Sequence, residues 1–367
     1  MRKRASSESK QSFSFIALLT RKWEISRRIF RDEGVITLFV EVFCQICKPA
    51  VWLYDSIRLR WYRAIGMKSV TVLGNQIAVL PKDPGISREL ALYKVHEPLA
   101  TRLLMQTLEP GMNVVDIGSN IGYYAMLEAR MVGPAGRVIA IEPMPKNYEQ
   151  LRRNVQDNGY WQIQTLQLAI GDRDGTAPLY LSGKSNHHSL HRNPSTRGAL
   201  QVPVRSLDSL LDQYHLSSVD LVRMDLEGYE VIVIHGMLRT IEKYSPRLLV
   251  ELHPDLLGER VTVEYLRTLQ NHRYSAEWVF EQERDMPLRW RFLRIEKPTL
   301  NELMRDSRIC SGPRAMTALF SRNVRASVPA TQVKPGLWQS VTMVTDSRET
   351  EARARSGFRR RASNSSD

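Results

Sequence analysis

The sequence predicts an α/β fold in which a mostly parallel, seven-stranded sheet carries helices on both faces. Short apolar strands alternate with amphipathic helices from residue 111 onward. The stretch "VVDIGSNIGYY", Val114 to Tyr124, ends an apolar strand in a loop of small residues. The length of 367 residues is enough for one large core with extensions at both ends.

The alternation predicts the order of the elements. Strands are expected at residues 113–117, 137–142, 163–169, 220–224, 247–252, 276–280 and 315–320. Helices are expected between them at residues 121–131, 146–158, 229–244 and 262–271. Apolar strands that alternate with helices pair in parallel, and both faces of their sheet are then covered.

The region before the alternation predicts a lead-in at residues 64–110. "VTVLGNQIAVL" indicates a hairpin that turns at Gly74–Asn75. The following apolar pattern predicts one or two helices with a break at Pro98. We therefore divide the chain into a helical extension (1–63), this lead-in, a core domain (111–322) and a disordered tail (323–367).

The net charge of +13 is concentrated at the two ends of the chain. Residues 1–63 contribute +7 and residues 322–367 contribute +5, whereas residues 64–321 contribute +1. A nucleic-acid enzyme would more often carry a basic stripe on its folded domain, so no nucleic-acid partner is expected. Basic ends fit an acidic membrane surface or solvated tails.

The N-terminal extension combines apolar and basic residues without predicting a membrane span. Its uncharged runs are short, and Glu41, Lys48 and Pro49 interrupt the most apolar region. Residues 13–63 interleave aromatic side chains with arginine and lysine, and no signal peptide is indicated. We expect a cytoplasmic protein whose extension lies on the inner face of a membrane. A helix packed on the protein itself or on a partner subunit is the alternative.

The three cysteines indicate a reducing compartment. Cys44 and Cys47 form a C-x-x-C pair, but the sequence shows neither a second pair nor a histidine pair to complete a zinc site. We interpret them as small apolar side chains on a helix.

The glycine loop has the features of a nucleotide-like ligand site. In a doubly wound sheet, ligands bind beyond the carboxyl ends of the strands, where the first strand meets its helix. Gly118 and Gly122 allow close backbone approach, and Glu142, twenty residues further on, can accept both hydroxyls of a ribose. The row Gly118 to Gly122 lacks the middle glycine of the dinucleotide fingerprint. That pattern suits a ligand without a pyrophosphate, such as S-adenosylmethionine. Asp116 could accept hydrogen bonds from the ammonium group of that ligand.

The sequence resembles the FkbM family of S-adenosylmethionine-dependent methyltransferases from about Asp83 to His253. The resemblance rests on the stretches "VVDIGSNIGYY", "VIAIEPMPKNYEQLRRNV", "LQLAIGDRDG", "VRSLDSLL", "LVRMDLEGYEVIVIHGM" and "LLVELHP". It implies a class I methyltransferase (Rossmann-like) fold and methylation of a hydroxyl oxygen, often on a sugar, glycolipid or natural product. The family usually has alanine where Ser119 stands, a small-for-small change.

The candidate donor-binding residues lie on the matching stretches. They are Asp116, Gly118, Ser119, Asn120, Gly122, Glu142, Ala169 and Asp172.

Three titratable residues are candidates for the acceptor site. Asp225 ends the fourth predicted strand, Glu227 follows it, and His253 ends the fifth. A neutral hydroxyl is a weak nucleophile and gains from a base at this rim. The structural alternative for Asp225 is a helix N-cap, with Glu227 and Glu230 placed favourably for the helix dipole.

The polar segment "LSGKSNHHSLHRN", residues 181–193, contains three histidines and no carboxylate. Loop residues that contact the acceptor fit this pattern better than metal ligands do, and a solvated loop fits it comparably. No metal ligands are predicted.

Two rival functions use the same fold. A nucleotide-binding oxidoreductase of the Rossmann type would normally show the middle glycine and a Tyr-x-x-x-Lys base, and both are absent from this sequence. A non-catalytic, membrane-attached scaffold would be expected to lose the loop or the acidic rim, and both are intact.

Overall fold

A computed structural model describes residues 35–80, 82–192, 196–282, 295–306 and 315–322. The chain divides into two compact units. The first comprises Met1–Ile57 with Glu283–Leu293, and the second comprises Arg58–Gln282 with Arg294–Asp367. Residues 1–34 of the predicted extension and the predicted tail from residue 323 lie outside the described residues.

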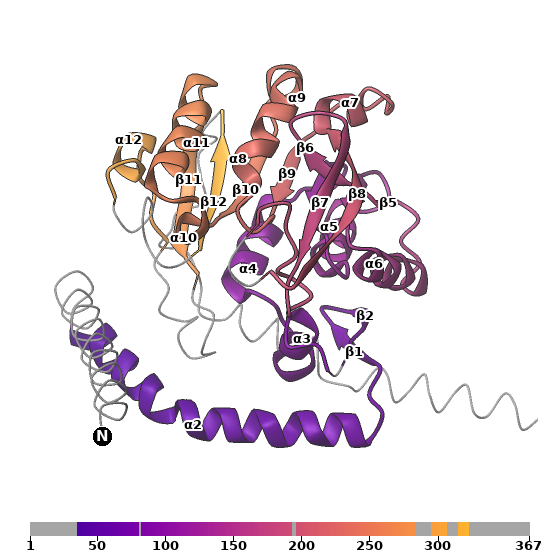
Figure 1. The fold of residues 1–367 in the computed structure, drawn as a ribbon, viewed down its shortest axis with the longest axis vertical. Helices are drawn as coiled ribbons and strands as arrows, with labels where there is room; N and C mark the ends of the chain where they lie inside the picture. The colour runs from indigo at the N-terminus through magenta and orange to yellow at the C-terminus, as the bar shows by residue number, and fades with distance from the viewer. Residues whose placement is uncertain (1–34, 81, 193–195, 283–294, 307–314, 323–367) are drawn as a thin grey trace, which may run out of the picture. The chain divides into compact units, whose positions relative to one another are not determined.

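The second unit contains a seven-stranded sheet with the order β11-β12-β10-β9-β3-β4-β5 (Figure 1). Its strands are β3 (Asn113–Ile117), β4 (Arg137–Ile141), β5 (Ile163–Leu166), β9 (Leu221–Met224), β10 (Arg247–Leu252), β11 (Ser275–Glu281) and β12 (Met316–Ser321). β12 runs antiparallel to both of its neighbours, and the pairs from β10 to β5 are parallel. This is the class I methyltransferase fold, as the sequence analysis predicted.

Helices bury both faces of this sheet because apolar residues occupy both sides of its strands. Val115 and Ile117 of β3 join a core that also includes residues of η1 (Ile234–Met237) and α11 (Glu259–Asn271). Val114, which points to the opposite face, is equally buried. The remaining helices after β3 are α5 (Tyr123–Val132), α6 (Pro145–Asp157), α7 (Leu207–Leu211), α8 (Glu230–Val233), α9 (Leu238–Tyr244), α10 (Pro254–Leu257) and α12 (Leu300–Leu303).

The predicted helix at residues 229–244 is divided into α8, η1 and α9. A side chain at Gly236 would clash with the backbone carbonyl of Gly171. This close approach accompanies the tighter 3₁₀ turn in the middle of the segment.

A second, three-stranded sheet was not predicted. It has the order β6-β8-β7, with β6 (Ala169–Gly171), β7 (Gly175–Leu181) and β8 (Gly198–Ser206). The prediction of one strand at residues 163–169 is wrong, because β5 ends at Leu166 and Ala169 pairs with Val204 of β8. Apolar periodicity contains no information about which strand a residue pairs with.

The lead-in forms a hairpin and two helices, as predicted. β1 (Ser69–Val72) pairs with β2 (Asn75–Ala78), and α3 (Ile86–Tyr93) precedes α4 (Pro98–Thr107). The predicted turn is displaced by one residue, because Val72 pairs with Asn75 and leaves Leu73–Gly74 as the loop. Both loop residues have positive φ, which a two-residue hairpin turn of this kind requires.

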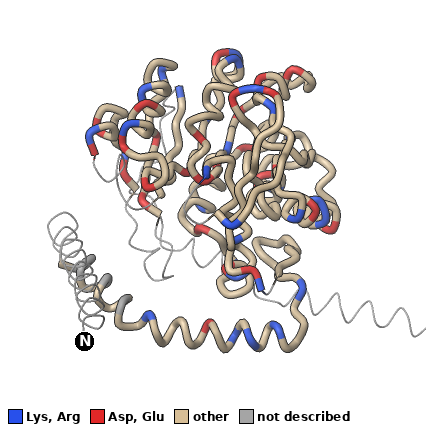
Figure 2. Tube along the Cα trace, in the orientation of Figure 1, with Lys and Arg blue, Asp and Glu red and all other residues tan. Residues whose placement is uncertain are grey.

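The helix α2 (Val35–Ala64) contains Cys44, Cys47 and Pro49. Among the helices described, none combines the length and apolarity that a bilayer crossing needs. The C-terminal half of α2 contains Asp55, Arg58, Arg60 and Arg63, and Figure 2 shows basic positions in blue along it.

Candidate functional site

The register of the large sheet brings three strand ends to one edge. Ile117, the last residue of β3, pairs with Ile141 at the end of β4 and with Met224 at the end of β9. The glycine loop, Glu142 and Asp225 each follow directly after these paired residues. The parallel pairing therefore places all three at the carboxyl edge, where ligands bind in such folds.

The glycine loop approaches the backbone that follows β9. Gly118 has a φ of 86°, and a side chain there would clash with the carbonyl oxygen of Asp225. Asn120 also has a positive φ, and its amide donates to the carbonyl of Ser185 at 3.0 Å. Ser119 is buried and donates through Oγ to the carbonyl of Asp116 at 2.9 Å. These contacts hold the loop in one conformation before any ligand arrives.

Glu142 joins the loop after β3 to the loop after β4. Its carboxylate accepts the backbone N–H of Asn120 at 2.9 Å and that of Met144 at 2.9 Å. Burial raises the pKa of Glu142 to about 7, although both hydrogen bonds act in the opposite direction. The carboxylate is thus poised to change its charge near neutral pH.

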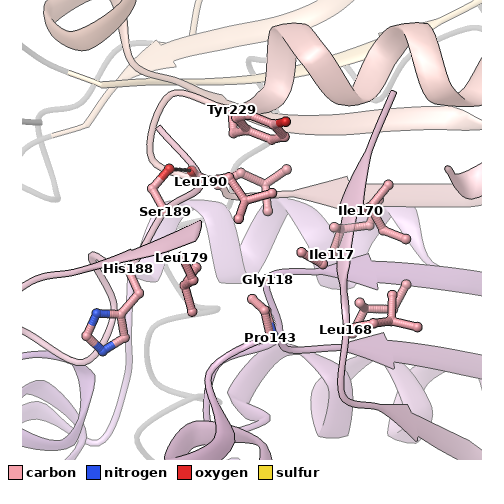
Figure 3. A pocket seen from close by; sticks show the side chains of 13 residues that line it. Ile117, Gly118, Pro143, Leu168, Ile170, Leu179, His188, Ser189, Leu190 and Tyr229 are labelled. Carbon is pink, nitrogen blue, oxygen red and sulfur yellow. Dashed lines mark hydrogen bonds between the residues drawn. The ribbon is translucent and has the colours of Figure 1, made fainter. Parts of the chain in front are cut away.

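An apolar cavity of about 320 Å³ lies beside this loop (Figure 3). Ser189, one of its lining residues, donates through Oγ to the carbonyl of Leu226 at 2.7 Å. The lining residues are Ile117, Gly118, Ile141, Pro143, Leu168, Ala169, Ile170, Leu179, His188, Ser189, Leu190, Leu226 and Tyr229.

A second, more polar cavity of about 570 Å³ shares part of this wall. Gly118, Pro143, His188 and Leu226 line both cavities, so the two cavities adjoin, and we call them the apolar lobe and the polar lobe. The other residues of the polar lobe are Ile86, His96, Ser119, Asn120, Tyr123, Tyr124, Glu142, Asn147, Ser185, Asn186, Arg223 and Asp225.

Two cationic side chains line the polar lobe. Arg223 lies 3.0 Å from Asp116 and 3.3 Å from Asp225, and its guanidinium covers the ring of Tyr124 at 3.9 Å. His96 contacts Glu89 through Nδ1 at 2.6 Å. Burial acts to lower the pKa of His96, but the nearby glutamates raise it to about 9. His96 is therefore positively charged at neutral pH.

Next to the polar lobe, carboxylates gather around His253. Its ring nitrogens lie 3.3 Å from Glu230, 3.4 Å from Glu251 and 3.5 Å from Glu227. Burial, and then the charge of Glu251, raise the pKa of Asp225 well above its ordinary value. Burial would also raise the pKa of Glu227, but His187 and His253 lower it. The charges of this cluster are strongly coupled.

Comparison with known proteins identifies the domain that carries this site. The family model named "Methyltransferase FkbM domain" matches residues 116–276. Residues 116–276, which we call the FkbM domain after this match, are thus similar to that family.

The relatives of the FkbM domain are distant. The hexuronic acid methyltransferase AglP of Haloferax volcanii is 26% identical over 164 residues, which are 44% of this chain and 64% of that protein. The 2-O-methyltransferase NoeI of Sinorhizobium fredii is 28% identical over 177 residues, 43% of this chain and 69% of that protein. The match thus spans slightly less than two thirds of AglP.

Two solved structures show a weak likeness to the chain. Methyltransferase FkbM from Methylobacillus flagellatus KT has a TM-score of 0.29 and 17% identity, and the match covers 45% of this chain and 42% of that one. Fibrillarin of Aeropyrum pernix, solved with S-adenosyl-L-methionine, has a TM-score of 0.34 and 15% identity, with 60% and 74% covered.

The structure brings many of the predicted site residues together. Six of them line the two lobes, namely Gly118, Ser119, Asn120, Glu142, Ala169 and Asp225. Glu227 and His253 lie within the neighbouring acidic cluster.

Three predicted donor-binding residues have other surroundings. Asp116 is fully buried within β3 and paired with Arg223, and Gly122 packs against Leu151. Asp172 is exposed, and its carboxylate lies 4.0 Å from the guanidinium of Arg173. Asp225 binds Arg223 through its side chain, and Glu230 instead accepts the N–H of Leu226 before α8, so the capping alternative for Asp225 is not what the structure shows.

Several residues of the polar lobe were not predicted from the sequence, including His96, Tyr124, Asn147 and Arg223. Arg223 lies inside a strand and His96 lies between two helices, so neither stands at a position that a motif marks. The segment at residues 181–193 lines both lobes through Ser185, His188 and Ser189 among others. Over its described residues, 181–192, this segment therefore forms part of the cavity wall and is not merely a solvated loop.

Proposed function

We propose that the FkbM domain is an S-adenosylmethionine-dependent methyltransferase that methylates a hydroxyl oxygen on a sugar, glycolipid or natural product. The observation that carries this proposal is the pair of adjoining lobes, which share Gly118 as a lining residue and are bordered by Glu142 and Asp225. One lobe is apolar and the other contains charged and amide groups, as a ligand with a base at one end and an amino acid at the other requires.

The residues of the cavity fit the parts of the donor. The apolar lobe, with Pro143, Leu168 and Leu226, suits the adenine ring. Glu142 stands beside the wall that both lobes share and would accept the ribose hydroxyls once ionised. Arg223 and His96 line the polar lobe as cations that already pair with carboxylates, and the donor's carboxylate would approach them alongside these partners. When bound, S-adenosylmethionine would supply a sulfonium methyl group, whose C–S bond breaks as the new C–O bond forms.

Asp225 is the strongest candidate for the base that receives the hydroxyl proton. It lines the polar lobe directly, while Glu227 and His253 stand behind it in the acidic cluster. Burial and the charge of Glu251 raise the pKa of Asp225, and a raised pKa makes its ionised form a better proton acceptor. We assign Glu227 and His253 to positioning and charge balance around Asp225.

A polyhydroxylated acceptor fits the remaining groups of the polar lobe. The side-chain oxygen of Asn186 has no hydrogen-bond partner among the described residues and would accept a hydroxyl group. Asn120, Asn147 and Ser185 also line the lobe, although their side chains already bond within the protein. Two relatives are named for methylation of a hexuronic acid and for 2-O-methylation. These names support a sugar hydroxyl as the acceptor.

A calorimetric titration and a product assay test this function together. We expect S-adenosylmethionine and its demethylated product to bind, and NADH not to bind. Incubation with ¹³C-methyl donor and a panel of hexuronides, simple glycosides and phenols should label an ether carbon on a sugar, which NMR distinguishes from N-methyl and ester carbons. Binding of NADH instead of the methyl donor would overturn the whole assignment, whereas labelling of nitrogen would overturn only the acceptor class.

We also propose that α2 holds the enzyme peripherally on the cytoplasmic face of an anionic membrane. Its exposed apolar side chains are Val35, Phe39, Val42, Phe43, Ile46, Trp52, Leu53, Tyr54, Ile57 and Trp61. Arg58, Arg60 and Arg63 follow near its C-terminal end (Figure 2). Apolar area together with basic residues favours an anionic lipid interface, at about 1 kcal/mol for each basic residue near the surface.

Vesicle sedimentation tests this attachment. The full chain should pellet with anionic vesicles and be released by salt, whereas a chain that begins at Ile65 should stay in the supernatant. Equal sedimentation of both chains, or of neither, would return α2 to the role of a packing or dimerisation helix.

A further inference from the structure

The acidic cluster contains three potential metal ligands that meet at the carboxyl ends of β9 and β10. Asp225 follows β9, Glu251 is the penultimate residue of β10, and His253 follows β10. Each offers one ligand atom, and these atoms lie within 4.8 Å of one another. Two carboxylates and one imidazole at such separations can coordinate a single divalent ion.

The histidine of this cluster is buried without a hydrogen-bond partner. His253 is 2% exposed, and neither of its ring nitrogens has a hydrogen-bond partner in the part of the chain that the structure describes. Carboxylate oxygens stand 3.3 to 3.5 Å from these nitrogens, but none is aligned as an acceptor. Buried polar atoms are normally satisfied, so His253 is satisfied either by ion pairs with these carboxylates or by a further ligand such as a metal ion.

The charges around His253 also call for a cation. Asp225, Glu227, Glu230 and Glu251 converge on this one imidazole. The nearby cations are already engaged: Arg223 is shared between Asp116 and Asp225, and His187 contacts Glu227 at 3.3 Å. Gathered carboxylates stay ionised only where positive charge compensates them, because like charges and burial both oppose ionisation.

We propose that Asp225, Glu251 and His253 bind a divalent transition-metal ion at the edge of the polar lobe. Carboxylate oxygens together with one imidazole nitrogen suit Mn²⁺ or Zn²⁺ better than a purely oxygen-seeking ion such as Ca²⁺. No metal ligands were predicted from the sequence because Asp225, which follows β9, and Glu251, which lies on β10, show no metal-binding spacing.

The consequence of such an ion for catalysis rests on the proposed function. Asp225 lines the polar lobe, so an ion held there would stand beside the acceptor. A divalent ion would coordinate the acceptor hydroxyl, lower its pKa and fix its orientation. Asp225 would then act as a ligand and a carrier of negative charge in addition to its role as proton acceptor.

Mn²⁺ binding to the full-length protein, after removal of metals with a chelator, tests the site without any methyl acceptor. Electron paramagnetic resonance follows the loss of the free Mn²⁺ signal during titration, and elemental analysis gives the stoichiometry. We expect one ion per chain in the wild type. Glu251→Gln and His253→Gln should each weaken binding at least tenfold, because loss of outer-shell contacts alone costs about that much.

Glu277→Gln is the matched control. Glu277 is also a buried carboxylate, but it lies on β11 and pairs with Arg247. Its replacement should leave Mn²⁺ binding unchanged. Circular dichroism and calorimetric binding of S-adenosylmethionine check that each variant is folded.

The outcomes separate the metal site from the proposed function. If the wild type does not bind Mn²⁺, or if all variants bind it equally, the proposed metal site is wrong. A protonated His253 would then balance the charge of the carboxylates. Binding of the methyl donor by the metal-free protein would keep the proposed function in either case. Specific Mn²⁺ binding without donor binding would support the metal site and overturn the donor assignment.

Discussion

The two halves of the site are built in different ways, although they share one edge of the sheet. The donor half, formed by the glycine loop and Glu142, uses backbone groups and a carboxylate whose hydrogen bonds are already made. The half around Asp225 gathers carboxylates around His253, and both ring nitrogens of His253 lack a hydrogen-bond partner among the described residues. The donor half is therefore preorganised, whereas the other half requires a proton, a cation or an acceptor to complete it.

The largest expected effect comes from Asp225, the residue where the two halves meet. Asp225→Asn removes the proposed base, and loss of a general base typically lowers turnover by about 100- to 10,000-fold. Donor affinity should change little, because Glu142 and the glycine loop remain intact. Single-turnover methyl transfer and calorimetry measure the two quantities separately. Full activity in this variant would remove Asp225 from the chemistry.

Substitution of Gly118 tests how rigid the donor half is. Gly118→Ala places a side chain against the Asp225 carbonyl at a positive φ, whereas Gly111→Ala has a similar φ with open space around it. Both should lose about 1 kcal/mol from backbone strain, and Gly118→Ala should lose roughly 1–3 kcal/mol more from overpacking. Chemical denaturation of the two variants measures the difference. Equal stabilities of the two variants would show that the glycine loop can shift to accommodate the side chain, and would contradict a preorganised donor half.

Glu142 should make donor binding depend on pH. Its pKa of about 7 means that it is largely protonated at pH 6 and ionised at pH 8, and only the ionised form accepts both ribose hydroxyls well. Donor affinity of the wild type should therefore rise across this interval. Glu142→Gln should be weaker at pH 8 by about 1.5–3 kcal/mol and nearly independent of pH. Calorimetry at the two pH values checks both statements, and an equally pH-dependent variant would contradict them.

The raised pKa of Glu142 should also make the free energy of unfolding depend on pH. Because the pKa of Glu142 is raised in the folded state, its contribution to stability is present in full at acidic pH. That contribution is lost as the pH rises toward 7, so donor binding and stability should respond to this group in opposite directions. Denaturation of wild type and Glu142→Gln between pH 5 and pH 8 measures the stability difference.

The smallest effect is expected at Ser119. Its hydroxyl makes one buried hydrogen bond to the Asp116 carbonyl, and such a bond contributes about 0.5–1.5 kcal/mol. Ser119→Ala should therefore lower stability slightly and leave donor affinity unchanged. A large loss of affinity would show that the hydroxyl contacts the donor and that the donor half is less backbone-based than we infer.

The difference between the halves also explains which residues were predictable. The donor half is local in sequence, since Gly118, Asn120 and Glu142 belong to one β-α-β unit. Strand pattern, glycine positions and the spacing to Glu142 identify such a unit, because each reflects a local backbone requirement. Those residues were predicted and line the cavity.

The alternation of strands and helices, the glycine loop and the acidic residues at the strand ends could be predicted from the local pattern of residues. Three features became visible only in the folded chain: Arg223 joins Asp116 to Asp225, His96 faces the polar lobe, and Glu251 lies beside His253 and Asp225. The structure also shows that residues after β5 leave the large sheet and pair with β8. Periodicity shows which face of an element is buried, but pairing between distant elements depends on register and packing, which no local pattern records.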